Sequence, residues 1–503
     1  MRLTARLLTS VGGALLLASP TLATWSIVVV DHATQEVGIA GATCIENLQV
    51  QRFIAVVSVG KGVGAAQNVV DPTAQNRILM LRGMEMGLTA EEILDDLATL
   101  PSFGASQLGI ATLAGPAAFS NSGGAAALGV TGELGSMSYA IGGNVLAGNA
   151  VVFEAERAFL GSSGDMGQRL MAAMEAARAF GGDGRCSCDA DTPTACGSPP
   201  PAFDKSAHTS FIVVARIGDQ DGVCNSDDGC ANGTYYLNRN VRGDFSDPDP
   251  VDVLRERYDT WRVNRIGVAD GLLSRVEPAA TSMPADGTTT TTVTVRLRDL
   301  DDNPLAFGGF PLAVREIDGP QPASVESVED NGDGTYSIIL RAGTEPGQGR
   351  WRIVALQGAR PRTLHPPLEL EVAPVTPLHI GLVEVSASEG ADVPLVTNAG
   401  ANEAGRSYLV LASASGTSPG TPFSGGVLPL NADRLLRFTF MNPGPPTFPG
   451  SMGQLDGAGR AEASLRASTA MLSPFIGGRF DFSTVLFGSP DEFTAPVGFD
   501  ILP

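Results

Sequence analysis

Residues 24–30 read Thr-Trp-Ser-Ile-Val-Val-Val, and the interpretation of the chain starts from this stretch. Its β-branched residues favour an extended strand, because side chains branched at Cβ pack well on a pleated surface. The run ends at Asp31-His32, and a second apolar run over residues 36–42 follows a polar turn. The sequence therefore predicts two successive strands here.

The residues before this stretch are typical of a secretory signal peptide, predicted over residues 1–23. Two arginines precede a short apolar run, residues 7–18, and Thr21-Leu22-Ala23 supplies the small-x-small pattern of a cleavage site. Cleavage there makes Thr24 the first residue of the mature protein. Cleavage after Ala18 is an alternative. We expect a secreted product, extracellular or periplasmic, without a transmembrane span, because no later stretch reaches the ~18 apolar residues that a span needs.

Composition excludes several classes of protein. The chain has 503 residues, 43% of them hydrophobic, which is enough for folded cores. Its formal net charge of −21 would repel phosphate backbones, so we expect no nucleic-acid partner. The sequence contains two lysines, Lys61 and Lys205, and its other basic residues of the Lys/Arg class are all arginines.

Six cysteines agree with export into an oxidising compartment. Five lie between residues 186 and 230, and Cys44 is distant. An even count in such a compartment predicts disulfide bonds, for which six cysteines allow 15 pairings. A zinc cluster is the alternative, although the C-x-C spacing of Cys186 and Cys188 fits a zinc site poorly.

The pattern of predicted elements changes once along the chain. Up to about residue 271, strands, helices and strands follow one another, which predicts sheets between helical layers. After it, alternating runs such as residues 288–298 predict an all-β region without helices, in two modules over 272–373 and 374–503. Further strands are predicted over 52–59, 107–113, 138–141 and 209–216, and helices over 71–86, 89–97, 151–160, 165–180 and 249–261.

Residues 24–271 resemble the uncharacterised bacterial DUF1028 family, whose members begin Thr-Phe-Ser-Ile-Val. Residues 24–30 and 36–40 carry the start of this resemblance. The matching stretches then continue in order at residues 62–67, 87–92, 107–109, 143–148, 181–183, 249–251 and 254. The chain departs from the family pattern by a cysteine-containing insertion over 185–203 and a second cysteine loop over 224–230.

This resemblance implies the αββα sandwich of the N-terminal-nucleophile (Ntn) hydrolases. It implies that Thr24 attacks a carbonyl with its hydroxyl while its own free α-amine acts as the base. The candidate oxyanion donors are Asn144 and Gln67, and the alternative for each is an amide that serves a turn or a strand end. Lys61 is a candidate for lowering the pKa of the amine, with a solvated loop lysine as the alternative. We expect no cofactor and no metal site, because the four histidines show no metal-binding spacing.

Residues 272–373 resemble the immunoglobulin-like module of invasin and intimin, on Pro284-Ala285-Asp286-Gly287 and Asp333-Gly334-Thr335-Tyr336. Two functions follow. The first is a secreted Ntn-type hydrolase that cleaves an amide or acyl bond in an unknown amide-containing substrate. The second is a non-catalytic binding or adhesion protein, whose β modules bind the cell envelope or an extracellular polymer.

Overall fold

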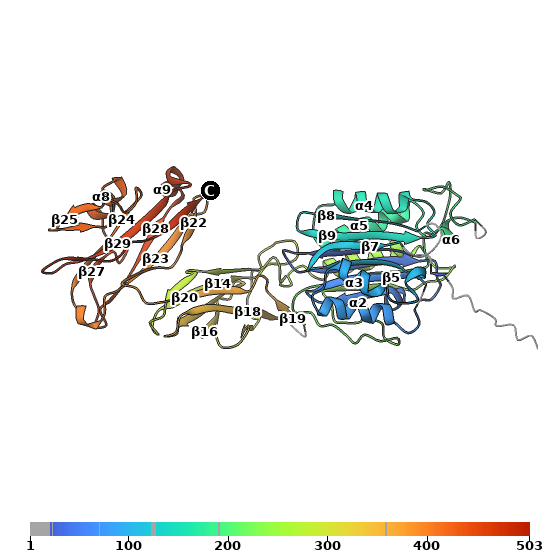
Figure 1. The fold of residues 1–503 in the computed structure, drawn as a ribbon, viewed down its shortest axis with the longest axis horizontal. Coiled ribbons are helices and arrows are strands. Elements are labelled where there is room, and N and C mark those ends of the chain that lie inside the picture. The colour runs from blue at the N-terminus through green and yellow to red at the C-terminus, as the bar shows by residue number, and fades with distance from the viewer. Residues whose placement is uncertain (1–20, 23, 70, 122–126, 190–191, 358–359) are drawn as a thin grey trace, which may run out of the picture. The chain divides into compact units, whose positions relative to one another are not determined.

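The structure, a computed structural model, describes residues 21–22, 24–69, 71–121, 127–189, 192–357 and 360–503. The chain divides into two units, Met1–Asn264 and Arg265–Pro503 (Figure 1). The predicted signal peptide lies outside the described residues except for Thr21 and Leu22. No helix in the described ranges combines the length and apolar composition needed to span a membrane.

The first unit contains a six-stranded sheet, and Thr24 lies in one of its strands. The strand order is β11-β10-β3-β2-β9-β8, and every neighbouring pair is antiparallel. Thr24 lies opposite Thr43 on one side and opposite Asn144 on the other. The strands are β2 (Thr24–Asp31), β3 (Val37–Thr43), β8 (Leu128–Leu134), β9 (Met137–Asn144), β10 (Thr209–Ala215) and β11 (Leu237–Val241).

The second sheet of this unit has the order β1-β5-β6-β7, and β4 also pairs with β5. Its strands, all joined in antiparallel pairs, are β1 (Thr21–Leu22), β4 (Ala55–Ser58), β5 (Gly62–Val69), β6 (Gln107–Thr112) and β7 (Gly115–Ser120).

Helices cover the outer faces of both sheets, as Figure 1 shows. Alternate residues of β2 point to opposite sides. Trp25, Ile27 and Val29 pack in a core with the helices α4 (Ala150–Gly161), α5 (Met166–Ala179) and α7 (Pro250–Val263). Val28 and Val30 pack in the layer between the sheets. The helices α2 (Gln75–Glu85) and α3 (Ala90–Leu97) close the other side. The predicted αββα sandwich is confirmed.

Local signals located several helices correctly. Thr89 and Glu92 form the predicted capping box of α3, and Asp165 caps α5. The helix predicted from residue 71 begins only at Gln75, because the Asp71 carboxylate accepts hydrogen bonds from Thr73 and forms a turn there. The strand predicted over 52–59 is also wrong in its first part, where the short helix α1 (Val50–Ile54) precedes β4. Two further short elements are η1 (Phe103–Ala105) and α6 (Gly184–Ser187).

The second unit begins with a β sandwich built of two sheets. They have the orders β12-β14-β17-β16 and β13-β20-β18-β15, and β19 adds to β18. Trp351, Tyr336 and Ile338 are buried in its core. The strands are β12 (Arg275–Pro278), β13 (Ser282–Pro284), β14 (Thr290–Arg296), β15 (Leu312–Glu316), β16 (Ala323–Asp330), β17 (Thr335–Ala342), β18 (Gly347–Gln357), β19 (Arg360–Thr363) and β20 (Leu368–Ala373).

A second sandwich follows, with the sheets β21-β23-β28 and β22-β31-β29-β24-β27 and a hairpin of β25 and β26. Its core holds several phenylalanines, including Phe448, Phe480 and Phe499. The strands are β21 (Leu378–Ile380), β22 (Glu384–Ser386), β23 (Ala391–Asn398), β24 (Ser407–Ser413), β25 (Thr421–Phe423), β26 (Gly426–Leu428), β27 (Met452–Gln454), β28 (Arg460–Ala467), β29 (Arg479–Leu486), β30 (Glu492–Phe493) and β31 (Val497–Leu502).

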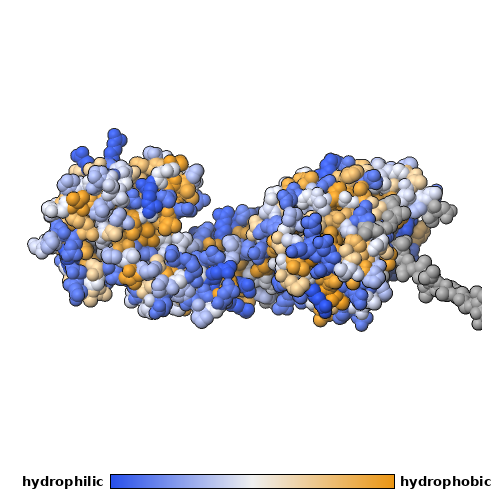
Figure 2. Space-filling model, viewed as in Figure 1, coloured by the Kyte–Doolittle hydropathy of each residue, from blue (hydrophilic) through white to orange (hydrophobic). Residues whose placement is uncertain are grey.

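The expectation that this region lacks helices is wrong. The helix α8 (Arg434–Met441) is capped by the Asp433 side chain, and the shorter elements η2 (Ala401–Glu403), α9 (Thr469–Leu472) and η3 (Ser473–Phe475) are also present. Eight residues give too little periodicity for a helix to stand out in the sequence. Phe440 and Met441 at its end are exposed, and Figure 2 shows apolar residues among polar ones on the visible face of this sandwich.

All six cysteines form disulfide bonds, which link Cys44 to Cys186, Cys188 to Cys196 and Cys224 to Cys230. The predicted disulfides are confirmed, and the zinc alternative is wrong because every sulfur is bonded to another. The Cys44–Cys186 bond joins the end of β3 to α6, across a sequence separation of 142. It therefore ties the inserted cysteine segment to the strand next to β2.

Candidate functional site

Thr24 begins β2 at one end of the layer between the two sheets. Its side chain lies on the same face of the sheet as Val28 and Val30, which pack in that layer, because residues two apart in a strand share a face. Thr43 and Asn144 face the same layer, since they lie directly opposite Thr24 in antiparallel register. Thr24 is fully buried. One face of the six-stranded sheet thus places three polar residues together.

Two glutamines of the other sheet complete this cluster. The Nε2 of Gln67 on β5 donates to the Oε1 of Gln107 on β6 at 2.6 Å, and it lies 3.4 Å from the carbonyl oxygen of Thr24. The Nδ2 of Asn144 donates to the same Gln107 oxygen at 3.1 Å. The Nε2 of Gln107 donates to the carbonyl of Gly143 at 2.7 Å. The structure thus brings together Thr24, Gln67 and Asn144 of the predicted site.

Gln107 is the residue at the centre of the cluster, and the sequence analysis did not select it. The available signal was its polar side chain at the start of the buried run over residues 107–112, inside a stretch that carries the family resemblance. It is fully buried, and it accepts from both Gln67 and Asn144.

Two oxygens of the cluster are unsatisfied. The Oε1 of Gln67 and the Oδ1 of Asn144 are buried and have no hydrogen-bond partner among the described residues. Gln67 is 1% exposed and Asn144 is 0% exposed, so bulk water does not satisfy them. Buried acceptors are nearly always paired, and leaving one unpaired costs about 1–3 kcal/mol. The cluster therefore holds two acceptors to which no described residue donates.

The backbone is strained beside both of these amides. Asn68 follows Gln67 with a φ of 79°, and Val145 follows Asn144 with a φ of 49°. A β-branched residue rarely adopts a positive φ, and each such residue costs about 1–3 kcal/mol. Surrounding contacts hold both in place, since the Nδ2 of Asn68 donates to the Ala105 carbonyl and the carbonyl of Val145 accepts from the N–H of Gly184. Such strain often accompanies functional sites.

A buried ion pair lies beside Thr43. Arg185 donates to the Asp183 carboxylate at 2.7 Å and contacts the Oγ1 of Thr43 at 3.3 Å. Asp183 is fully buried and also accepts from the N–H of Cys44 at 2.7 Å. Burial raises the pKa of Asp183, against the opposing effect of these hydrogen bonds and of the Arg185 charge. The pair places a guanidinium next to the residue that faces Thr24 across the sheet.

Two contacts fix that ion pair against the strands. The Cys44–Cys186 disulfide holds α6, which carries Arg185, at the end of β3. The ring of Trp25 packs beneath the turn at Gly182, where φ is 54° and a Cβ would lie 2.6 Å from the ring. Only glycine accommodates this approach and this φ together. The turn before Asp183 is therefore packed directly on the neighbour of Thr24.

Lys61 lies elsewhere. It precedes β5, whereas Gln67 lies near the end of that strand, about 20 Å further along at about 3.3 Å per residue. Its Nζ is exposed and donates to the carbonyl of Glu85 at 3.1 Å. The structure does not bring Lys61 to the cluster around Thr24, where Arg185 supplies the positive charge.

One group has the spacing of metal ligands but not their chemistry. Single ligand atoms of Cys44, Cys186 and His208 lie within 4.8 Å of one another. The two sulfurs are joined in a disulfide, so neither offers the thiolate that a metal binds. This group is therefore no metal centre while the disulfide is intact.

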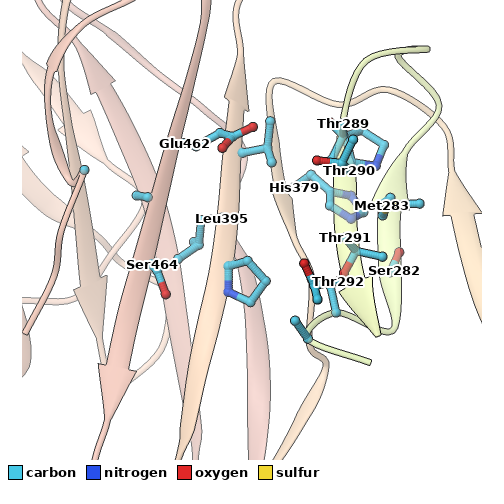
Figure 3. A pocket seen from close by; sticks show the side chains of 18 of the residues that line it. Ser282, Met283, Thr289, Thr290, Thr291, Thr292, His379, Leu395, Glu462 and Ser464 are labelled. Carbon is cyan, nitrogen blue, oxygen red and sulfur yellow. The ribbon is translucent and has the colours of Figure 1, made fainter. Parts of the chain in front are cut away.

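A separate cavity of about 450 Å³ lies in the second unit. Thr289 and Thr291 line it from the first sandwich, and His379, Glu462 and Ser464 line it from the second (Figure 3). His379 is 8% exposed, and its Nε2 has no partner among the described residues. Burial lowers the pKa of His379, so its imidazole is neutral at pH 7. The cavity therefore offers hydroxyls and one unsatisfied imidazole nitrogen.

Comparisons with known proteins give each unit a relative. Residues 24–190 match the model of a family of unknown function, DUF1028, and residues 270–359 match that of invasin domain 3. No curated protein matches the chain.

Several solved structures are similar. A DUF1028 protein from Silicibacter pomeroyi is 18% identical, over 47% of this chain and 88% of that chain, with a TM-score of 0.34. The adhesin InvE of Yersinia pseudotuberculosis is 16% identical over 45% and 58%, with a TM-score of 0.19. The Escherichia coli adhesin FdeC is 11% identical over 95% and 97%, also with a TM-score of 0.19. By their family-model matches, residues 24–190 of this chain are similar to the DUF1028 family, and residues 270–359 are similar to invasin domain 3.

Proposed function

We propose that the first unit is an N-terminal-nucleophile hydrolase that cleaves an amide or acyl bond with Thr24. The observation that carries the proposal is the place of Thr24. It begins a central strand and faces a buried cluster in which the oxygens of Gln67 and Asn144 lack donors. Removal of residues 1–23 would create an α-ammonium group on Thr24, and its N–H donors would satisfy those oxygens.

The proposed reaction uses the hydroxyl and the α-amine of Thr24 together with one water molecule. The neutral α-amine accepts the proton of the Thr24 hydroxyl, and Oγ1 bonds to the carbonyl carbon of the substrate. The resulting ammonium gives the proton to the leaving amine as the C–N bond breaks, and water then hydrolyses the ester on Thr24. An α-amine has an ordinary pKa of about 7.7–8.0, so a useful fraction is neutral near pH 7.5.

The remaining groups stabilise charge. The side-chain amides of Asn144 and Gln67 carry the N–H groups that would donate to the oxyanion. Arg185, rather than Lys61, supplies the positive charge that disfavours protonation of the amine, because it contacts Thr43 next to Thr24. Asp183 and the Cys44–Cys186 bond hold Arg185 in position.

We propose that the protein works outside the cytoplasm. Three disulfide bonds and an invasin-type domain are consistent with an extracellular location. Export would also supply the cleavage that exposes Thr24, since the predicted signal-peptide site ends at Ala23.

The decisive test compares two chains that differ by one residue. One begins at Thr24 and the other at Ala23. An epoxyketone probe reports the difference, because its ketone adds the threonine hydroxyl and its epoxide is then opened by the free amine of the same residue. We expect labelling of the chain that begins at Thr24 and none of the longer chain.

Substitutions at Thr24 provide the controls. Thr24→Ser should retain labelling, and Thr24→Ala should lose it by at least about 1,000-fold. Mass spectrometry of the exported protein checks that its first residue is Thr24. Equal labelling of both chains, or a different mature N-terminus, would contradict the proposal.

A second candidate function is ligand binding by the second unit. The invasin-type domain and the unsatisfied His379 in the cavity favour it. The full chain with Thr24→Ala should then be retained on an insoluble cell-envelope polymer, and His379→Phe should reduce this retention. If the Thr24→Ala chain is not retained, the binding function is excluded for that polymer.

A further inference from the structure

The edge of β5 is divided between two partners. Residues 62–65 pair with β4, whereas Asn68 and Val69 pair with Leu22 and Thr21 of β1. Beyond the end of β4, the backbone of β5 on this side is therefore paired by residues that precede the predicted cleavage site. Their removal leaves this part of the β5 edge, at Asn68 and Val69, without its neighbouring strand.

The direction of this pairing matters for chemistry. Thr21 and Leu22 stand on the acyl side of the bond before Thr24. Their antiparallel pairing lays that side of the chain along the end of β5, next to Gln67. A substrate carbonyl that reacts with Thr24 has its own acyl side in the same direction.

We propose that the Thr24 site takes extended peptides, whose acyl-side residues add to Asn68 and Val69 of β5 as an antiparallel strand. This inference rests on the proposed hydrolase function and names its substrate class. An unpaired strand edge is a ready template for an added strand, and its main-chain hydrogen bonds provide affinity. Ala23 precedes Thr24 in the sequence, so a test peptide with alanine at the acyl position reproduces the natural order of residues.

The slot is rigid before a substrate arrives. Asn68 is 4% exposed and adopts a φ of 79°, and its Nδ2 is fixed on the Ala105 carbonyl at 2.8 Å. Gln67 next to it donates to Gln107. A preformed edge loses little conformational entropy when a strand is added. The partners near the slot are amides and backbone groups, which fits a neutral peptide backbone.

The test uses the mature chain and three epoxyketones that differ in recognition elements. The first carries Ser-Pro-Thr-Leu-Ala, the sequence of residues 19–23. The second is the same peptide with N-methyl groups on its Thr and Leu amides, which removes the donors for a strand. The third is acetyl-Ala. We expect the first to label Thr24 at least 10-fold faster than the other two.

The outcomes separate this inference from the proposed function. Equal labelling rates for all three probes would overturn the inference and leave the hydrolase intact. Binding is measured separately with the unreactive amide of the same peptide, by hydrogen exchange at the backbone N–H groups of Asn68 and Val69. Protection at either of these N–H groups without labelling by any probe supports the peptide slot and overturns the hydrolase. Neither protection nor labelling overturns both.

Discussion

The two ends of β2 and β3 show opposite uses of polar residues. At the far end, Glu36 pairs with Arg216 at 2.6 Å, and the guanidinium stacks on the ring of Tyr236 at 3.5 Å. The Asp31 carboxylate there accepts the N–H groups of Ala33 and Thr34. At the Thr24 end, buried amide oxygens have no donor among the residues that the structure describes. The polar cluster at the far end is thus complete, whereas the cluster at the Thr24 end leaves two acceptors without donors among the described residues.

The largest expected effect concerns two of the disulfides, one near Thr24 and one beside β4. Loss of Cys44–Cys186, which spans 142 residues, should lower the free energy of unfolding by about 5 kcal/mol, because it frees a long loop in the unfolded chain. Loss of Cys224–Cys230, which spans six, should lower it by about 2 kcal/mol. Urea unfolding of the paired Cys→Ala variants measures both.

Labelling distinguishes the same two variants. Cys44–Cys186 holds Arg185 near Thr43, whereas Cys230 lies beside β4, where its carbonyl accepts a hydrogen bond from the N–H of Val57. Only the first loss should slow the reaction of Thr24 with an epoxyketone. Equal slowing in both variants would mean that the disulfides act through stability alone.

The ion pair gives the next effect. Asp183→Asn should lower the free energy of unfolding by about 3 kcal/mol. The substitution leaves the mostly buried Arg185 without its charged partner. Asp252→Asn is the matched control, since Asp252 pairs with Arg178 at the surface and should cost less than about 1 kcal/mol. Thermal unfolding of the two variants tests the difference. Similar losses would show that Asp183 is not a buried anchor.

A third prediction compares an amide of the cluster with the predicted lysine. Asn144→Ala should slow turnover of a peptide substrate by about 100-fold, the usual loss when one oxyanion donor is removed. Lys61→Ala should leave the rate unchanged, because its amine lies on the Glu85 carbonyl. A reduced turnover rate of the Lys61→Ala variant would contradict this prediction and indicate that Lys61 contributes to the reaction.

The smallest effect is a pH dependence of stability. Burial lowers the pKa of His208, and nearby Lys205 lowers it further, while Glu46 and Asp183 oppose them. The unfolded chain then binds a proton more readily than the folded one. Stability should fall as the pH drops below about 6.5 and level off below the folded pKa. His208→Phe should flatten melting temperatures over this range, and an unchanged slope would contradict the assignment.

Local signals in the sequence carried much of the fold. The capping box of Thr89 and Glu92 and the β-branched run of β2 depend on neighbours in sequence, and both were predicted. The roles of Gln107 and Arg185 were not. Gln107 meets Asn144 because two sheets stack, and Arg185 reaches Thr43 because tertiary contacts, the Cys44–Cys186 bond among them, hold residues far apart in sequence together. Lys61 was selected partly because lysine is rare in this sequence, and rarity carries no information about where a residue lies in the fold.

Trp25 links β2 to the turn that precedes Asp183, because its ring fills the space under Gly182. Neither segment can shift without the other. Heat or denaturant should therefore not loosen the two halves of the cluster one at a time, and partially active intermediates should not accumulate. The protein would lose its chemistry in a single cooperative step, at the temperature at which its outer helical layer separates from the sheet.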